Sequence, residues 1–242
     1  MRISRIYQPV KLKFGILIQL DKSASNHTVN VLRLKINAPL IIFNGEGGEY
    51  AAEITQIKRH AVKVKIGRFQ NINRESKLKI HLIQSISRSE KIDFILQKAV
   101  ELGVTKITPI ITERCKIKLS KDRQHKRIAR WQKIIISACE QCGRNILPEL
   151  NQITHLADLI TTLSADLKII LNPEANNTLH NVTGKPKSIA ILIGSEGGFT
   201  ENEIQLTEKY NFCSIKLGPR ILRTETAGLA IISILQKRFG DF

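Results

Sequence analysis

A glycine-rich loop, "IGSEGGFT" at 193–200, follows the apolar run "SIAIL" and carries a single carboxylate, that of Glu196. Glycine adopts backbone angles that other residues avoid, so such a loop can bring its main chain close to a ligand. The loop lacks the GxxxxGK pattern of a phosphate-binding loop and the GxGxxG pattern of a dinucleotide site. Because Glu196 would also repel a phosphate, the loop predicts a cationic or polar ligand. A plain tight turn between a strand and a helix is the simpler alternative.

The glycine-rich loop and a second loop, "LGPRILRTETA", each lead directly into a predicted helix. Thr200 and Glu203 fit the capping box T-x-x-E, which fixes where the helix after the glycine loop begins. In "LGPRILRTETA", Thr224 can cap a helix and Glu225 lies in its first turn, where the helix dipole stabilises an acid. Arg223 does not fit this pattern, because the dipole disfavours a cation there. Ordinary capping beside surface arginines is one interpretation, and an anionic partner such as an RNA phosphate or a nucleobase oxygen is the other.

The elements that must position these loops alternate between strand and helix from residue 78 onward. This alternation predicts a parallel α/β sheet, whose ligands bind outside the carboxyl ends of the strands. "LNPEA" follows a further strand, so three loops are expected at that edge. Strands are expected at 78–85, 106–111, 167–172, 188–194 and 213–217. Helices are expected at 89–103, from the central basic segment to near "CEQCGR", and at 154–163, 200–210 and 224–240.

The first part of the chain has a different pattern, with short apolar or alternating runs separated by turn residues. Small, basic, β-rich modules often bind RNA, although a fold alone proves no function. The polar stretch 69–77 has no periodicity and is interpreted as a linker, which gives domains at 1–70 and 77–242. Strands are expected at 14–20, 39–45, 48–58 and 61–67, a short helix at 27–34 and a turn at 44–48.

The net charge of +17 is unevenly distributed along the chain. Residues 1–80 hold 15 Lys and Arg against 5 Asp and Glu, a net charge of +10. Residues 113–133 hold 9 against 2, a net charge of +7, whereas residues 134–242 hold 10 against 11, a net charge of −1. Segregated basic charge is what binding to a phosphate backbone requires. The sequence therefore predicts a nucleic-acid partner, with a solvated basic face as the alternative.

The chain carries no sign of a membrane segment or an export signal. No apolar run approaches the roughly 20 residues that a membrane helix needs, and the N-terminus lacks the apolar stretch of a signal peptide. We therefore expect a cytoplasmic protein with no membrane partner and with its four cysteines reduced. Cys139 and Cys142 form a CxxC pattern inside a predicted helix, but no second pair of ligands is well spaced, so no metal is expected.

Several long stretches of the chain resemble one known family. They are "LIGSEGGFTENEI", "IKLGPRILRTETAGLAIISILQ", "SEKIDFILQKAVELGVTKITPIITERC" and "WQKIIISACEQCGRNILPE", together with "MRISRIY" and "VLRL" near the start. All of them resemble the RsmE family, the 16S ribosomal RNA (uracil-N3)-methyltransferases of the SPOUT superfamily. The resemblance spans nearly the whole chain. Ser195 departs from it, because the family usually has proline there, and serine loses the preset φ that stiffens the loop.

The resemblance implies the fold, the cofactor and the assembly. It implies an N-terminal PUA-like β-barrel that binds RNA and a C-terminal SPOUT α/β-knot domain with a deep trefoil knot, which general folding rules would not predict. It also implies S-adenosyl-L-methionine as the cofactor, held in the knot by the three loops, and a homodimer with the site beside the subunit interface. The cofactor-binding positions that it implies are Leu171, Asn172, Pro173, Ile193, Gly194, Glu196, Gly197, Leu217, Gly218, Ile221, Leu222 and Arg223.

The implied reaction methylates N3 of a specific uridine in the 16S RNA of the small ribosomal subunit. N3 carries a weakly acidic proton that must leave, and the enzyme must align the base and stabilise negative charge on its carbonyl oxygens. Arg223 is the candidate for that charge, and Glu225 is the candidate base, although the helix dipole makes it a weak one. The target base must leave any stack that it occupies, while the front domain and residues 114–133 bind phosphates.

Two other functions stay open at the level of the residues. One is an RNA-binding assembly factor with an inactive cofactor pocket, which the intact "LRTETA" and the glycine loop disfavour. The other is a nucleotide-dependent enzyme of the doubly-wound class, which the missing P-loop and GxGxxG spacings disfavour. The residues do not identify the general base or the dimer interface. They also leave open a role for the CxxC and the choice between free RNA and the assembled subunit.

Overall fold

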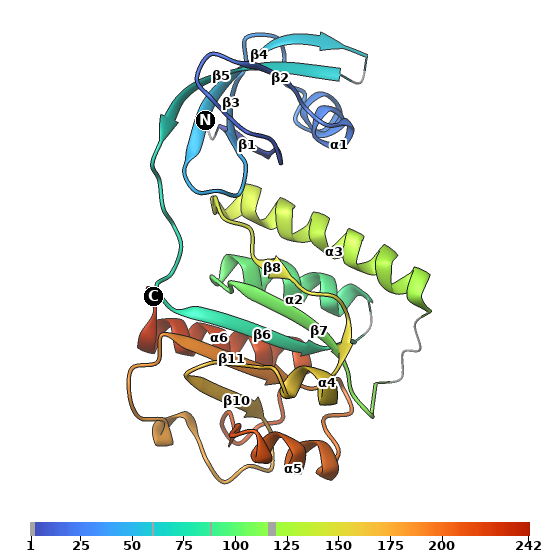
Figure 1. Ribbon diagram of the computed structural model, residues 1–242, viewed down its shortest axis with the longest axis vertical. Helices are drawn as coiled ribbons and strands as arrows, with labels where there is room; N and C mark the ends of the chain where they lie inside the picture. The colour runs from blue at the N-terminus through green and yellow to red at the C-terminus, as the bar shows by residue number, and fades with distance from the viewer. Residues whose placement is uncertain (1–2, 60, 88, 116–119) are drawn as a thin grey trace. The chain divides into compact units, whose positions relative to one another are not determined.

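The computed structural model describes residues 3–59, 61–87, 89–115 and 120–242 (Figure 1). The chain divides into two compact units, each with its own sheet. Unit 1 consists of Met1–Glu75 and Ile136–Leu147, and unit 2 consists of Ser76–Ile135 and Pro148–Phe242. Within the described residues, no helix has the length and apolar character needed to cross a membrane.

Unit 1 is built on a five-stranded sheet with the order β1-β3-β4-β5-β2. β1 pairs with β3 in parallel, and the other neighbours are antiparallel. In β5, alternate residues Val62, Val64 and Ile66 are buried in the core, as the period of two in the sequence predicts. The strands are β1 (Ser4–Tyr7), β2 (Leu17–Gln19), β3 (Pro39–Phe43), β4 (Glu49–Lys58) and β5 (Ala61–Gln70).

A set of charged and polar side chains, most of them buried, joins this sheet to the chain that follows the long helix, and we call it the unit 1 network. Arg5 donates to Glu49 Oε2 from Nη1 and to Asn145 Oδ1 from Nη2, each at 2.5 Å. Burial alone would raise the pKa of Glu49, but hydrogen bonds from Arg5 and Asn145 and the charge of Arg5 outweigh it and lower the pKa. The network consists of Arg5, Glu49, Arg74, Glu75, Arg144 and Asn145.

Unit 2 is built on a seven-stranded sheet with the order β12-β10-β11-β6-β7-β8, and β9 also pairs with β7. Every pairing between its described strands is parallel, which confirms the predicted α/β class. The strands are β6 (Lys79–Ser85), β7 (Lys106–Ile111), β8 (Glu149–Leu150), β9 (Thr154–His155), β10 (Leu167–Leu171), β11 (Ser188–Ile193) and β12 (Cys213–Ile215).

Helices cover both faces of the unit 2 sheet. On one face, Leu156 of α4 belongs to the same core cluster as Ile83 and Leu192 of the sheet, and Leu206 of α5 packs against that cluster. On the other face, α6 approaches β11 so closely that a Cβ on Gly228 would lie 3.8 Å from Ile193 Cγ1. The helices are α2 (Ser89–Glu101), α3 (Lys121–Cys142), α4 (Leu156–Ile160), α5 (Glu201–Lys209) and α6 (Thr224–Phe239), with a 3-10 turn, η2 (Leu179–Asn181).

Two predicted helices have the wrong bounds. In place of a helix at 27–34, α1 (Lys22–Asn26) begins earlier, because Asp21 caps it by accepting from Ala24 N, and it continues into a π-helical turn, η1 (His27–Val31). The helix predicted at 154–163 is shorter, because its first two residues pair with β7 as β9.

Other elements were not predicted at all. β1 was missed because Arg5 occupies a buried position in it, and a charged residue there hides the alternation. β8 and β9 hold only two residues each, too few to show a period. The linker was predicted at 69–77, but β5 runs to Gln70, so the linker begins after that residue. Lys116 and Lys118 of the predicted basic segment lie outside the described residues.

Candidate active site

The three predicted loops meet at the carboxyl edge of the unit 2 sheet. They follow β10, β11 and β12, which are neighbouring parallel strands. Asn172 N donates to Ile215 O at 3.0 Å, which joins the loop after β10 to the end of β12. Thr224 Oγ1 donates to Gly194 O at 2.5 Å, which joins the glycine loop to the start of α6. Chain segments 50 residues apart in sequence therefore border one site.

The glycine loop has the close packing that its composition predicts. Gly198 has a φ of +69°, and its N donates to Ser195 O at 2.9 Å, which closes a tight turn. A Cβ on Gly194 would lie 3.2 Å from Gly198 Cα, and a Cβ on Gly197 would lie 3.2 Å from the Cβ of Arg114. Larger residues would therefore have to displace the loop. The predicted capping box is confirmed, because Glu203 N donates to Thr200 Oγ1 and Thr200 N donates to Glu203 Oε2.

The prediction that Thr224 caps α6 is wrong. The cap residue is Arg223, which makes no side-chain capping bond, and Thr224 is the first helical residue. The Thr224 hydroxyl instead donates to Gly194 O and accepts from Gln84 Nε2 at 3.1 Å. The guanidinium of Arg223 is exposed and has no partner among the described residues. A cation at a helix start without a protein partner can bind an anion at the edge of the loops.

A lysine that sequence reasoning missed lies between the two predicted carboxylates. Lys91 Nζ, on α2, lies 2.9 Å from Glu196 Oε1 and 3.7 Å from Glu225 Oε2. We call these three residues the Lys91 bridge. The side chains of Lys91 and Glu225 are 26 % and 17 % exposed, so the pair is partly shielded from solvent. The only signal in the sequence was the helix "SEKIDF" itself, whose lysine is one ordinary polar residue on an amphipathic helix.

Several buried polar atoms around the loops have no hydrogen-bond partner in the described part of the chain. They are Gln84 Oε1 at the end of β6, Ser195 Oγ in the glycine loop and Glu225 Oε2 in the first turn of α6. Gln84 and Ser195 are buried, at 2 % and 8 % exposure. Unsatisfied buried polar atoms are costly in a folded protein, and such atoms gathered at one place indicate a ligand site.

The predicted cofactor-binding residues differ in what they expose. Ile193 is buried and packs against α6, so it supports the loop from below. Ile221 is 85 % exposed, which is unusual for a large apolar side chain and favours a contact with a bound group or a second subunit. Leu171, Asn172, Gly194, Leu217 and Leu222 are half-buried, and Pro173, Glu196, Gly197, Gly218 and Arg223 are exposed.

Cys139 of the CxxC pair has the properties of a core cysteine. Cys139 is buried in α3, and this burial raises the pKa of its thiol to about 12, although Arg144 acts in the opposite direction. A thiol that holds its proton so tightly is a poor nucleophile and a poor metal ligand. No group of three or more His, Cys, Asp and Glu side chains in the described part of the chain is arranged to hold a metal ion.

Comparison with known proteins gives the family. Residues 74–236 match an RNA methyltransferase domain and residues 20–67 match an RNA methyltransferase PUA domain. Ribosomal RNA small subunit methyltransferase E of Buchnera aphidicola subsp. Schizaphis graminum is 42% identical over 99% of this chain and 98% of its own length.

Two solved structures with S-adenosylmethionine bound have the same fold. The enzyme of that name from Neisseria gonorrhoeae has a TM-score of 0.93 at 39% identity, and the two chains cover each other fully. A Legionella pneumophila protein, also covered fully, has a TM-score of 0.98 at 44% identity. On the family model and the full-length relative together, the chain belongs to the family of ribosomal RNA small subunit methyltransferase E.

Proposed function

We propose that this protein transfers a methyl group from S-adenosyl-L-methionine to N3 of a specific uridine in 16S ribosomal RNA of the small ribosomal subunit. The main support is the arrangement at the carboxyl edge of the unit 2 sheet. Three loops meet there beside the Lys91 bridge and beside Arg223, which has no partner among the described residues. The chain also belongs to the family of ribosomal RNA small subunit methyltransferase E. The basic charge of residues 1–80 and 113–133 supports an RNA substrate.

The residues at this edge fit the cofactor. The glycine loop can bring its main chain close to a bound group, because glycine has no side chain, and a Cβ on Gly194 or Gly197 would crowd protein atoms at 3.2 Å. Ser195 Oγ and Gln84 Oε1 are buried and lack a protein partner, so a ligand would satisfy them. Exposed Ile221 and half-buried Leu222 offer apolar contacts to an adenine ring. The carboxylate of Glu196 is at the loop surface, where a sulfonium would be attracted rather than repelled.

The chain's own residues would handle the charge and the proton. When bound, the cofactor supplies an electrophilic methyl group. Arg223 would hold a carbonyl oxygen of the uracil and stabilise the negative charge that develops as the N3–H bond breaks. Glu225 would take that proton on its carboxylate, while the N3 electron pair forms the new bond to carbon. Lys91 would hold the Glu225 carboxylate in position, because its ammonium lies 3.7 Å away.

This assignment balances the charge of the site. Before the reaction, a sulfonium and Lys91 would face the carboxylates of Glu196 and Glu225, two positive charges against two negative ones. Methyl transfer neutralises the sulfonium, and protonation neutralises Glu225. One positive charge then faces one negative charge, and with the cation of Arg223 counted as well the net charge of the site would be +1 at both stages. A change in net charge inside a shielded site would be costly.

The finer description of the fold is part of the proposal. We assign residues 1–70 to a PUA-like β-barrel that binds RNA and residues 77–242 to a SPOUT domain whose chain forms a deep trefoil knot. The match of residues 20–67 to an RNA methyltransferase PUA domain supports the first assignment. The meeting of three distant loops at one sheet edge supports the second, as does membership of the family. We place the reaction in the cytoplasm, where small ribosomal subunits are found.

A homodimer is a further part of the proposal. Unit 2 exposes large apolar side chains, Ile221 at 85 %, Phe94 at 46 % and Ile234 at 43 %. Exposed apolar side chains of this size favour a protein partner, and a second copy is the simplest one. Light scattering after size exclusion should give twice the chain mass, and Ile234→Lys should reduce it to one chain. A monomeric wild-type protein would contradict the dimer and leave the reaction untouched.

The decisive experiment measures methyl transfer. Small ribosomal subunits that lack the modification are incubated with labelled S-adenosylmethionine, and the product nucleoside is identified by mass spectrometry. We expect the label in 3-methyluridine, with Glu225→Gln strongly impaired and the exposed Glu208→Gln unchanged as its control. Normal turnover in Glu225→Gln would exclude Glu225 as the base. Cofactor binding without any transfer to subunits or free RNA would favour the RNA-binding assembly factor.

A further inference from the structure

A cavity lies in unit 2, and none of the residues of the Lys91 bridge line it. Its volume is about 850 Å³, and it lies at the carboxyl end of β7, between the starts of α3 and α4 and one side of α5. Leu156 and Leu206 form an apolar part of its wall, and Gln124, Asn202 and Gln205 form a polar part. The volume is that of a typical binding site for a nucleotide-sized ligand. None of its lining residues belongs to the three cofactor loops.

The cavity nevertheless shares a wall with the active site. The segment after β7 lines the cavity through Thr112, Glu113 and Cys115. Glu113 N donates to Glu203 Oε1 at 2.9 Å, which ties this segment to α5. The next residue, Arg114, donates from Nη1 to Gly197 O at 2.9 Å, which ties the same segment to the glycine loop. The segment that lines the cavity therefore also contacts the glycine loop of the active site.

The lining residues have the chemistry that recognises a nucleobase. Asparagine and glutamine amides each present a donor and an acceptor, which match the edges of unpaired bases. His155 also lines the cavity and adds the nitrogens of its ring. It is the cap residue of α4, but its side chain makes no capping bond to that helix. Leu156 and Leu206 offer apolar surface to the faces of a planar ring, and Lys209 offers a cation to a phosphate.

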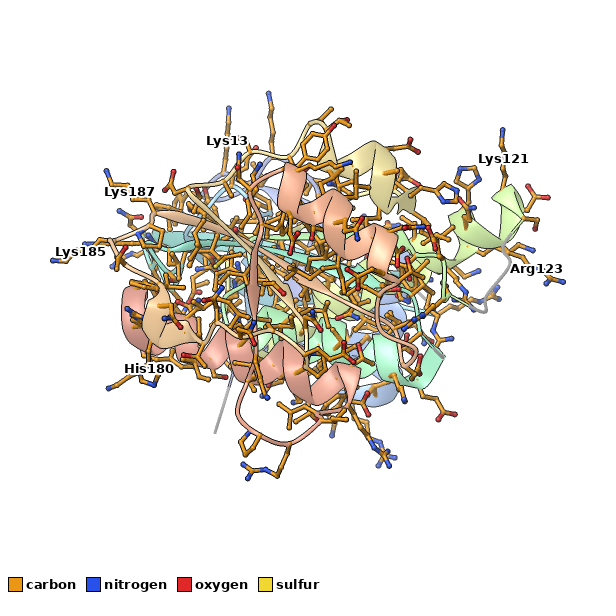
Figure 2. The ribbon with its side chains drawn as sticks, turned by 90° about the horizontal axis from the view of Figure 1, so that it is seen from below. Lys13, Lys121, Arg123, His180, Lys185 and Lys187 are labelled. Carbon is orange, nitrogen blue, oxygen red and sulfur yellow. The ribbon has the colours of Figure 1, made fainter. Side chains whose placement is uncertain are left out.

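The charge beside the cavity points to a polymer with a phosphate backbone. Gln124 belongs to the start of α3, where the sequence reads "KDRQHKR". Figure 2 shows Lys121 and Arg123 extending from this end of α3 into solvent. Several cations beside an amide-lined cavity are the arrangement by which proteins hold single-stranded RNA, with phosphates outside and a base inside.

We propose that this cavity receives one unpaired nucleotide of the RNA substrate, close in sequence to the uridine that is methylated. This inference rests on the proposed function, because it takes RNA as the substrate. It adds a specificity site to the reaction, since an enzyme that holds two bases at once accepts only an RNA in which both are unpaired. The Lys91 bridge and Arg223 act on the target base, whereas the cavity selects its neighbour.

The test uses the full-length protein and two cavity variants. Ala157→Phe places a ring in the cavity, and Gln205→Ala removes an amide without filling space. Glu208→Ala, on α5 but not among the lining residues, is the matched control. For each variant we would measure thermal stability, the Kd of S-adenosylmethionine, and kcat and KM for small subunits. Ultraviolet cross-linking of the RNA, followed by mass spectrometry, would identify the contacted peptides.

We expect Ala157→Phe to raise KM for subunits about tenfold, with the cofactor Kd unchanged, and Gln205→Ala to raise it about threefold. Cross-links should map to peptides containing 154–157 or 202–209 and should disappear in Ala157→Phe. An active wild-type enzyme whose KM and cross-links do not change in either variant would overturn the inference. If Ala157→Phe is unstable, Gln205→Ala alone decides.

The two proposals can fail separately. If the wild-type protein shows no methyl transfer, and subunit RNA still cross-links to the cavity peptides, the cavity inference holds and the proposed reaction is wrong. If free nucleoside monophosphates protect these peptides while subunit RNA does not contact them, the cavity is a site for a free nucleotide and the inference is wrong. Cross-linking of a protein to these peptides in place of RNA would also overturn it.

Discussion

The unit 1 network and the Lys91 bridge are both sets of opposite charges, but they are built differently. Arg5 and Glu49 are 6% and 3% exposed, and two further polar side chains, Arg74 and Asn145, donate to the same Glu49 oxygen. In the Lys91 bridge, one ammonium serves two carboxylates, and Glu225 Oε2 is buried without any hydrogen bond. Three protein donors thus reach the Glu49 oxygen, although Arg5 Nε has no partner within the described residues, whereas no donor reaches Glu225 Oε2 within hydrogen-bond distance there.

This difference separates a structural role from a functional one. A buried charge is stable only when it is paired and hydrogen-bonded, so a carboxylate held by three protein donors indicates a part that holds the fold together. An acid that keeps an unfilled oxygen at the edge of three loops is ready to accept a proton or a ligand. Substitutions should therefore affect stability in unit 1 and catalysis at the Lys91 bridge.

The largest effect is expected from breaking the unit 1 network. Glu49→Gln leaves the buried Arg5 without a counter-charge, and loss of one partner of a buried pair costs about 3–5 kcal/mol. Urea unfolding followed by circular dichroism would measure it. Glu53→Gln, an exposed residue of the same strand, is the control and should change stability by less than about 0.5 kcal/mol. An equal, small effect of both variants would show that the network is not structural.

Removing Arg223 should have nearly as large an effect, but on catalysis. Arg223→Ala should lower kcat by roughly 10² to 10³, about 3–4 kcal/mol, with stability almost unchanged, because the side chain is exposed and unpaired. Arg220→Ala, the exposed arginine nearby, is the control. If the methylation rate of Arg223→Ala returned to the wild-type value at saturating S-adenosylmethionine, Arg223 would bind only the cofactor, and its role at the uracil would be contradicted.

A hydrogen-bonded histidine in unit 2 tests whether pairing with protein groups, and not membership of unit 1, gives a polar side chain a structural role. His81 in β6 is hydrogen-bonded to Thr108 Oγ1 at 2.7 Å, and burial, with a smaller effect of Lys106, lowers its pKa from 6.5 to about 4. Below pH 6.5 the unfolded chain binds a proton that the folded chain refuses, so stability should fall from pH 6.5 to about 4. The fall should approach about 3 kcal/mol.

Two histidine variants isolate this effect. His81→Asn should flatten the dependence of stability on pH in this window, whereas His180→Asn, an exposed histidine (Figure 2), should leave it unchanged. The free energy of unfolding would be measured by urea titration at several pH values. An unchanged slope in His81→Asn would show that other groups control acid stability.

The sequence predicted what depends on local pattern and missed what depends on contact. The parallel sheet and the capping box of Thr200 follow from periodicity and from a spacing of three residues, and both are confirmed. β1 was missed because the burial of Arg5 depends on Glu49, which lies 44 residues away. Thr224 was assigned to a cap because a local rule favours it, whereas its hydroxyl bonds to Gly194.

The candidate site shows the same limit. The glycine loop and the loop before α6 are visible in the sequence, because glycines and an arginine at a helix start are unusual there. Lys91 was missed because it comes from a helix about 100 residues earlier and has no local oddity. The cavity at the end of β7 was missed for the same reason, since four separate segments line it.

The smallest effect, and the sharpest comparison, concerns two lysines of α2. Lys91 pairs with the two carboxylates of the site, and Lys98 pairs with Glu101 at 2.8 Å on the surface of the same helix. Lys98→Met should change neither catalysis nor stability by more than about 0.5 kcal/mol, as for most exposed pairs. Lys91→Met should lower kcat/KM about fivefold near neutral pH, roughly 1 kcal/mol, with little loss of stability.

A conservative variant then identifies the reason for that loss. If the positive charge of Lys91 beside the two carboxylates is what matters, Lys91→Arg should restore most of kcat/KM, because it keeps that charge. The Kd of S-adenosylmethionine separates the two carboxylates. A loss of kcat with an unchanged Kd would place the effect at Glu225, whereas a weaker Kd with an unchanged kcat would show that Lys91 only holds Glu196 and the glycine loop in place.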